Sequence, residues 1–139
     1  MSDTIQFELV SPEEKLVSAP VHMAVIPGEE GEFGVLAGHS SLVASLQPGV
    51  VALYDEPQGE PRKIFIAGGF ADVSAAQCTV LAEEAVLVSD LDQAKIEQKI
   101  ADLNEDLGIA EEAADKARIE KRLNLFKAKL SAVTGHLVT

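Results

Sequence analysis

The most informative segment of the chain is Gly31–Gly49, which reads GEFGVLAGHSSLVASLQPG. Gly31, Gly34 and Gly38 stand three and four residues apart, and the residues between them favour extended backbone, so we expect turns or bulges that flank a short strand. The Pro-Gly pair at the end indicates a turn before the next strand. A phosphate-binding loop is excluded, because His39 rather than a lysine follows the third glycine.

Two alternating runs precede this stretch. Apolar and polar residues alternate over Ile5–Leu9, which is the two-residue period of a strand with one buried face. Val21, Met23 and Val25 alternate in the same way, and Pro27–Gly28 closes that run before an acidic turn. Each run therefore predicts one strand.

A hairpin and a last strand are predicted after the stretch. Val50–Tyr54 and Lys63–Ala67 flank a loop rich in proline and glycine, so we expect two antiparallel strands. Gly68–Gly69 permits a tight turn or bulge before Phe70–Val73, and the alternation over Cys78–Ala82 predicts the final strand. Short strands separated by turn signals predict an all-β unit.

From Asp90 onward the apolar period becomes that of a helix, with Asp90 as the predicted N-cap and Gly108 as the predicted stop. Two sets of apolar residues recur at intervals of three and four: Ile96, Ile100, Leu103 and Leu107, then Ile119, Leu123, Phe126, Leu130 and Val133. Gly135 is the expected end of the second helix. Because few residues separate the two stripes, we predict an antiparallel two-helix hairpin over residues 88–139, after an all-β domain over residues 1–87.

Composition limits the classes of function. The chain has 139 residues, 47% of them apolar, and 23 acidic against 11 basic residues, so it can form a core but should repel nucleic acid and anionic lipid. The single cysteine, Cys78, cannot form an internal disulfide and is expected in the core. No apolar segment approaches the roughly 20 residues that span a bilayer, so we expect membrane association only through another protein.

Basic residues are concentrated near the end of the chain. Only one acid, Glu120, interrupts the basic run, which consists of Lys116, Arg118, Lys121, Arg122, Lys127 and Lys129. Two interpretations stay open: a solvated helix face, or a helix surface that binds an acidic partner.

Catalysis finds no support in the pattern of reactive residues. The three histidines, His22, His39 and His136, lie in different contexts, and no His, Cys, Asp or Glu cluster has metal-ligand spacing. Ser40 and Ser41 follow His39 without a nucleophile-elbow pattern. We therefore expect no catalytic residue, no metal and no cofactor.

The glycine-rich stretch and the residues that follow it resemble a known family, the epsilon subunit of the rotary F-type ATP synthase, which corresponds to delta in mitochondria. The matching residues run through the chain in order: Gly31, Glu32, Gly34, Leu36, Gly38, His39, Leu46, Pro48, Gly49, Gly68–Phe70 and Val80–Ala82. The resemblance implies a β-sandwich followed by the helical hairpin. It also implies a non-catalytic central-stalk subunit that couples proton-driven rotation to ATP synthesis.

The resemblance implies three sets of partners: the gamma subunit, the c-ring of the membrane sector, and the alpha and beta catalytic subunits, the last through the hairpin. In similar subunits the residues that match Glu32 and His39 lie at the base of the sandwich against the ring, so these two are the expected ring contacts. The implied location is the cytoplasmic face of the bacterial inner membrane, with an organellar energy-transducing membrane as the alternative. Whether the hairpin brakes ATP hydrolysis stays open.

Some relatives bind ATP in the folded hairpin through a motif of Ile or Leu, Asp, two variable residues, Arg and Ala. Here Leu91–Ile96 reads LDQAKI, so Lys95 replaces the arginine and Ile96 replaces a small residue. Lysine lacks the planar fork of arginine. Asp92 and Lys95 are therefore the candidate nucleotide contacts of a degraded motif, and we expect weak or absent binding. An ATP-sensing protein or an adaptor outside the synthase is the alternative function.

Overall fold

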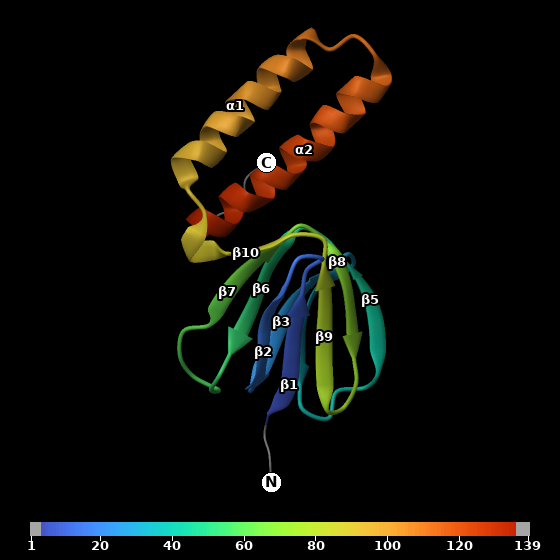
Figure 1. Cartoon of the computed structure of the whole chain (residues 1–139), viewed down its shortest axis with the longest axis vertical. Helices are drawn as coiled ribbons and strands as arrows, with labels where there is room; N and C mark the ends of the chain where they lie inside the picture. Colours follow the sequence, from blue (N-terminus) through green and yellow to red (C-terminus); the bar gives the residue numbers. More distant parts are fainter. Residues whose placement is uncertain (1–3, 136–139) are drawn as a thin grey trace. The chain divides into compact units, whose positions relative to one another are not determined.

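The computed structural model describes residues 4–135, and the protein divides into two compact units, residues 1–87 and 88–139. Among the described residues, the first unit is built of strands and the second of a 3-10 turn and two helices (Figure 1). His136, one of the three histidines of the sequence, lies outside the described residues.

The strands of the first unit form one hydrogen-bonded network that folds over on itself as a sandwich (Figure 1). They are β1 (Ile5–Val10), β2 (Lys15–Val21), β3 (Met23–Gly28), β4 (Gly31–Leu36), β5 (Leu42–Leu46), β6 (Gly49–Tyr54), β7 (Arg62–Ile66), β8 (Gly69–Val73), β9 (Gln77–Ala82) and β10 (Ala85–Leu87). Their order is β10-β7-β6-β3-β5-β8-β9-β1-β2, and β4 pairs with β3 off this path. The predicted sandwich is confirmed.

The core lies between the two folded halves of this sheet, and the first and last predicted strands supply much of it. Ile5, Phe7 and Leu9 of β1 are fully buried, and so are Cys78 and Val80 of β9. These strands run parallel, with Phe7 opposite Cys78. Burial of a large apolar side chain contributes about 1.5–3 kcal/mol to the stability of the fold. The buried residues that predict these strands therefore also stabilise them.

The run from Val21 to Val25 is not one strand, contrary to the prediction. Val21 ends β2, the backbone bends at His22, and β3 begins at Met23. A bend of one residue changes the face to which the following side chains point. The buried residues of β3 therefore include Ala24 and Ile26, while Met23 and Val25 are only partly buried.

Three strands carry too weak a pattern to be predicted. β2 contains Pro20, β5 exposes most of its side chains, and β10 has three residues. Proline is tolerated in β2 because this strand lies at one edge of the sheet. The predicted hairpin of β6 and β7 is confirmed, with Val51 opposite Ile64.

The second unit is the predicted antiparallel helical hairpin, formed by η1 (Val88–Asp90), α1 (Gln93–Ile109) and α2 (Ala113–Thr134) (Figure 1). Each predicted stripe contributes buried residues: Ile96 and Leu103 from α1, and Leu123 from α2. Gly135 ends α2 with a φ of 76°, as predicted.

The predicted boundaries of α1 are wrong. Asp90 lies in the 3-10 turn, and the N-cap is Asp92, whose side chain accepts a hydrogen bond from the backbone N–H of Lys95. Gly108 lies inside the helix, which continues to Ile109. A glycine stops a helix by adopting a left-handed conformation, and Gly108 has no positive φ.

Gly69 occupies a point where no side chain fits. It pairs with Leu46 on β5 and with Ala82 on β9, and its φ is 143°. A Cβ atom at this position would overlap the carbonyl oxygen of Leu81. The backbones of three neighbouring strands can therefore approach one another only because residue 69 is glycine.

Replacing Gly69 with Ala should lower the free energy of unfolding of the sandwich by about 3 kcal/mol, because the new Cβ adds backbone strain and meets main-chain atoms. Urea unfolding of the full-length protein, followed by circular dichroism, measures this loss. Gly34→Ala is the matched control, since the nearest atom to its new Cβ would be Met23 Sδ at 3.6 Å, an ordinary contact. Equal stability of the two variants would contradict this account.

Candidate functional site

The two expected ring contacts lie toward opposite ends of β4. Glu32 is opposite Pro27, next to the β3–β4 turn, whereas Leu36 is opposite Met23 at the other end and His39 follows it. At about 3.3 Å per residue, Glu32 and Leu36 are roughly 13 Å apart along the strand. The structure therefore does not bring Glu32 and His39 into one compact site, and a surface that contacts both must extend along β4.

The turn that carries His39 is fixed by hydrogen bonds. The backbone N–H of His39 donates to the Leu36 carbonyl at 3.1 Å, and Gly38 N–H donates to the Ala75 carbonyl at 2.8 Å. His39 Nδ1 lies 2.7 Å from the Ser40 carbonyl oxygen. Because a carbonyl oxygen can only accept, Nδ1 carries the proton, and Nε2 is left to meet a partner.

The other end of β4 is held by Gln47. Its backbone N–H donates to the Pro27 carbonyl and its side-chain Nε2 donates to the Gly28 carbonyl, both at 3.0 Å. Glu29 N–H donates to the Ser45 carbonyl at 3.0 Å. These bonds tie the β3–β4 turn to β5 and so fix the position of the acidic residues on this turn.

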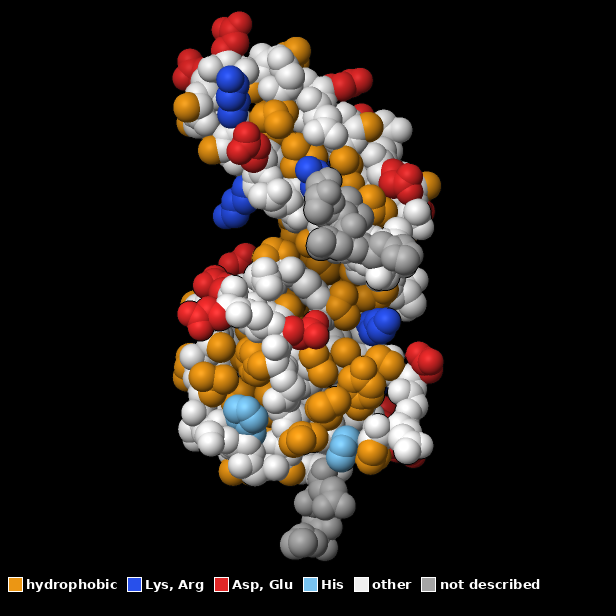
Figure 2. All heavy atoms as spheres, turned by 180° about the vertical axis from the view of Figure 1, so that it is seen from behind, with side chains coloured by type: hydrophobic (Ala, Val, Ile, Leu, Met, Phe, Trp, Pro, Cys, Tyr) orange, Lys and Arg blue, Asp and Glu red, His pale blue; other side chains and the backbone are white. Residues whose placement is uncertain are grey.

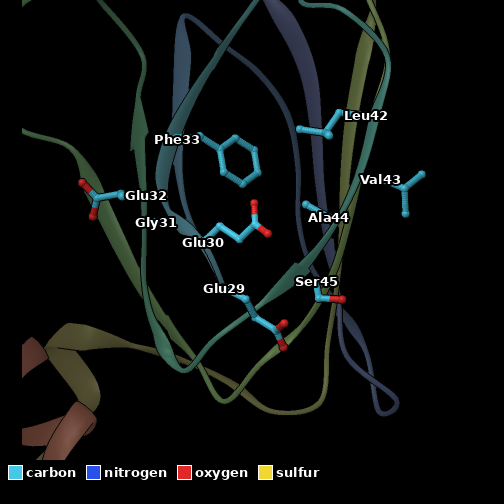
Figure 3. A pocket seen from close by; sticks show the side chains of 10 residues that line it. Glu29, Glu30, Gly31, Glu32, Phe33, Leu42, Val43, Ala44 and Ser45 are labelled. Carbon is cyan, nitrogen blue, oxygen red and sulfur yellow. The ribbon is translucent and has the colours of Figure 1, made fainter.

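A groove of about 560 Å³ lies between the β3–β4 turn and β5. Phe33 and Leu42 point toward each other across it, and Glu30 points toward the ring of Phe33 (Figure 3). Glu32 and Val43 point away from the groove (Figure 3). The floor is thus apolar and the rim acidic.

An exposed apolar row crosses the outer face of neighbouring strands. Phe70 on β8 is directly opposite Leu81 on β9, which is directly opposite Val10 on β1. Phe70 is 56% exposed and Leu81 53% exposed. Val43 on β5 is 72% exposed and lies opposite Asp72, two residues from Phe70 along β8. We call Phe70, Leu81 and Val10, which is partly buried, the outer row. Exposed apolar surface of this kind is typical of a protein contact.

The outer row was not predicted from the sequence, although a signal was present. Phe70 and Leu81 occupy the positions of their strands that should carry polar residues, because the alternate residues Ala71 and Val80 are buried. An apolar side chain on the outward face of a half-buried strand marks a contact surface. Their alignment across strands cannot be read from sequence, because it depends on the register of β8 against β9.

The basic run lies within α2, and part of its charge is paired inside that helix. Arg118 forms an ion pair with Asp115 at 2.8 Å. Arg122 and Lys129 lie 5.8 Å and 4.8 Å from the centre of the Phe126 ring. On the face shown in Figure 2, the Lys and Arg side chains belong mainly to the helical unit.

The remaining members of the run differ in exposure. Lys116 and Lys121 are exposed, whereas Lys127 is partly buried. Exposed ion pairs contribute little to stability. Lys116 and Lys121 are therefore accessible to a partner, and both interpretations of the run remain open.

Asp92 and Lys95, the candidate nucleotide contacts, meet each other through the backbone. Asp92 Oδ1 accepts from Lys95 N–H at 3.2 Å, which satisfies one of the free donors at the start of α1. The Lys95 side chain is exposed. A helix cap explains Asp92 without a ligand.

Cys78 is a core residue, as predicted. It is fully buried, and burial, with a smaller effect from the negative charge of Asp72, raises the pKa of its thiol from 9.0 to about 12. The thiol therefore stays protonated and unreactive at neutral pH. Among residues 4–135, no group of three or more His, Cys, Asp or Glu side chains is placed to hold a metal ion.

Residues 4–88 match the family described as the beta-sandwich domain of the ATP synthase delta/epsilon chain, and residues 92–138 match the C-terminal domain of the ATP synthase epsilon chain. These two matches define a delta/epsilon-type subunit of ATP synthases. The protein is 46% identical to the ATP synthase epsilon chain of Rhodospirillum centenum, over 97% of its own length and 95% of the relative. It is 38% identical to that of Maricaulis maris, over 98% and 100%. This chain belongs to the ATP synthase epsilon chain family, whose members are central-stalk subunits of the F-type synthase.

Solved structures agree with this assignment. A subunit of the Euglena gracilis mitochondrial ATP synthase, in a structure of its OSCP, F1 and c-ring parts, superposes with a TM-score of 0.85 at 27% identity, over 96% of this protein and 83% of that subunit. A subunit of the Tetrahymena thermophila mitochondrial ATP synthase, from its central stalk and c-ring, has a TM-score of 0.58 at 16% identity, over 91% and 96%, which shows the fold alone. No helix within the described part of the protein is long and apolar enough to span a membrane.

Replacing Asp92 with Ala should destabilise the helical hairpin by about 1 kcal/mol, because an N-cap hydrogen bond is lost. Asp90→Ala is the matched control, and it should change the stability by less than about 0.5 kcal/mol, since Asp90 does not cap α1. Thermal unfolding of the full-length protein followed at a helix-sensitive wavelength measures both. A larger loss for Asp90→Ala than for Asp92→Ala would refute the assignment of the cap.

Proposed function

We propose that this protein transmits rotation of the membrane rotor to the catalytic sector of the synthase, and that it performs no chemistry itself. The observation that carries this proposal is the outer row, a contiguous apolar surface on a rigid sheet. A rigid surface suits an element that must carry torque, and apolar area needs a partner to cover it. The histidines, serines and cysteine of the described residues form no catalytic arrangement.

The gamma subunit is the proposed partner of the outer row. Phe70 and Leu81 are neighbours on paired strands, so they can act together as the centre of an interface. Val43 extends the apolar surface onto β5, and Asp72, opposite Val43, places a charge within it. Gamma is therefore expected to offer an apolar surface with a complementary basic residue.

The c-ring is the proposed partner of Glu32 and His39. The separation of these residues along β4 requires ring contacts at both ends of that strand. Glu32 supplies a negative charge, and His39 Nε2 supplies a hydrogen-bonding atom at the opposite end. The complex would hold this protein as a peripheral subunit at the cytoplasmic face of the bacterial inner membrane. Bacterial relatives support this location over an organellar membrane.

The hairpin is the proposed regulatory element, and its basic helix α2 would meet an acidic surface on the alpha and beta subunits. Opening the hairpin exposes Ile96, Leu103 and Leu123, at about 1.5–3 kcal/mol for each side chain. Charge attraction alone does not offset that cost, so an open form needs new apolar burial along gamma. ATP is not a required ligand in this proposal, because Asp92 acts as a cap.

A pull-down of the tagged full-length protein from detergent-solubilised membranes tests the proposed assembly. It should recover gamma and the catalytic subunits, and Phe70→Glu should reduce that recovery at least roughly tenfold, because a charge is buried in the interface. Glu32→Ala combined with His39→Ala should retain gamma but weaken the c-ring contact. Each of these two changes should cost less than about 0.5 kcal/mol of stability.

Lys63→Glu on β7 is the matched control for Phe70→Glu, since Lys63 is also an exposed strand residue and lies outside the outer row. It should leave recovery unchanged. Recovery of gamma by Phe70→Glu at the level of the parent protein would reject the proposed docking surface. Failure of the parent protein to recover any synthase subunit would reject the proposed function itself.

Deletion of residues 89–139 should raise ATP hydrolysis by the assembled complex if the hairpin is a brake, and should leave assembly intact because the sandwich carries the docking surfaces. Steady-state hydrolysis by the purified complex, with the truncated subunit verified as bound, is the measurement. Lys116→Glu combined with Lys121→Glu should give a smaller increase in ATP hydrolysis than the deletion. Hydrolysis by this variant complex should also depend less on the salt concentration. Unchanged hydrolysis by the truncated complex would exclude the braking role.

A further inference from the structure

β4 has one open edge. Pro27 of β3 directs its carbonyl to Gln47, on the side away from β4. Backbone N–H and C=O groups point to alternate sides along a strand, so those of Gly28 and Ile26 face β4. The backbone groups of their partners on β4, Gly31 and Phe33, face β3.

It follows that the N–H and C=O groups of Glu32 and Gly34 point away from β3. Among the described residues, no strand other than β3 pairs with β4. An unpaired edge of this kind is a template for a further strand. Gly34 is exposed and carries no side chain, so another backbone can approach closely there.

The groove described above lies beside this edge. Its far side is β5, which pairs with β8 and meets β3 only at Leu46 opposite Gly28. The Ser45 carbonyl accepts from Glu29, so by alternation the backbone groups of Val43 also face the groove. The volume of about 560 Å³ is within the range of roughly 300–1,000 Å³ that is typical of binding clefts.

The charge around the groove selects the occupant. Glu29, Glu30 and Glu32 lie at the rim, and no Lys or Arg of the described residues lines the groove. Two copies of this edge would bring like charges together, which disfavours pairing between two copies of the protein. A basic segment would instead find complementary charge.

We propose that the groove between β4 and β5 receives an extended, positively charged segment of a neighbouring synthase subunit, which pairs with the open edge of β4 as an additional strand. The identity of the neighbour as a synthase subunit rests on the proposed function. Side chains of an added strand alternate between the two faces of the sheet. Residues beside Phe33 and Leu42 must therefore be apolar, and residues beside Glu32 must be basic.

A synthetic peptide of about eight residues that alternates lysine and valine tests the groove directly. Titrated into the isotopically labelled full-length protein, it should shift the amide signals of Glu32, Gly34 and Val43 and slow the hydrogen exchange of the Glu32 and Gly34 amides. A peptide that alternates glutamate and valine should give neither effect. Shifts spread evenly over the acidic surface, without slower exchange on β4, would overturn the proposal.

Charge reversal separates the groove from general attraction to an acidic protein. Glu30→Lys combined with Glu32→Lys should weaken peptide binding roughly tenfold or more. The matched control is Glu56→Lys combined with Glu60→Lys, which makes the same change of charge in the β6–β7 loop and should weaken binding less than about twofold. An equal loss for both pairs would overturn the proposal.

Hydrogen exchange in the intact synthase tests the partner. Assembly should slow the exchange of the Glu32 and Gly34 amides relative to the free protein. If the protein assembles and these amides exchange as fast as before, the strand-pairing proposal fails while the proposed function stands. If the protein does not assemble, the proposed function fails, and the peptide experiment still decides what the groove binds.

Discussion

The close backbone packing at Gly28 determines how the two halves of the sandwich are joined. β3 pairs with β6 through Met23–Val25 and then with β5 at Gly28, so a single strand joins the two halves of the sheet. A Cβ at Gly28 would lie 2.8 Å from the Gly31 carbonyl oxygen and 3.0 Å from the Phe33 ring. Only a glycine allows the turn, the corner and the packed ring to occupy the same place.

This corner also explains why the contact surfaces lie where they do. β5 leaves β3 at Gly28 and continues on the other half of the sheet beside β8. The departure separates β4 from β5 and produces the groove, and it brings β5, β8, β9 and β1 into one surface that carries the outer row. An acidic edge and an apolar face thus result from the same break in strand pairing, and both are held on a rigid core.

Local patterns sufficed for the strands and helices with strong periodicity. β1, β9 and the stripes of both helices are evident from alternation or from spacings of three and four. The bend at His22 depends on one residue, and β10 has only three residues. At the start of α1, Asp90 competed with the true cap, Asp92, in the prediction. Glu32 and His39 entered only through the resemblance. The groove and the outer row depend on pairing between distant segments, and for that reason no local pattern could reveal them.

The position of Cys78 has a practical consequence for the study of rotation. The one native thiol of the protein is enclosed by the core and kept protonated. A cysteine introduced on an exposed strand would react with a maleimide dye at neutral pH without competition from residue 78. Fluorophores for distance or single-molecule measurements can therefore be attached at one chosen point without first removing the native cysteine, so the packing of β9 against β1 stays undisturbed in the labelled rotor.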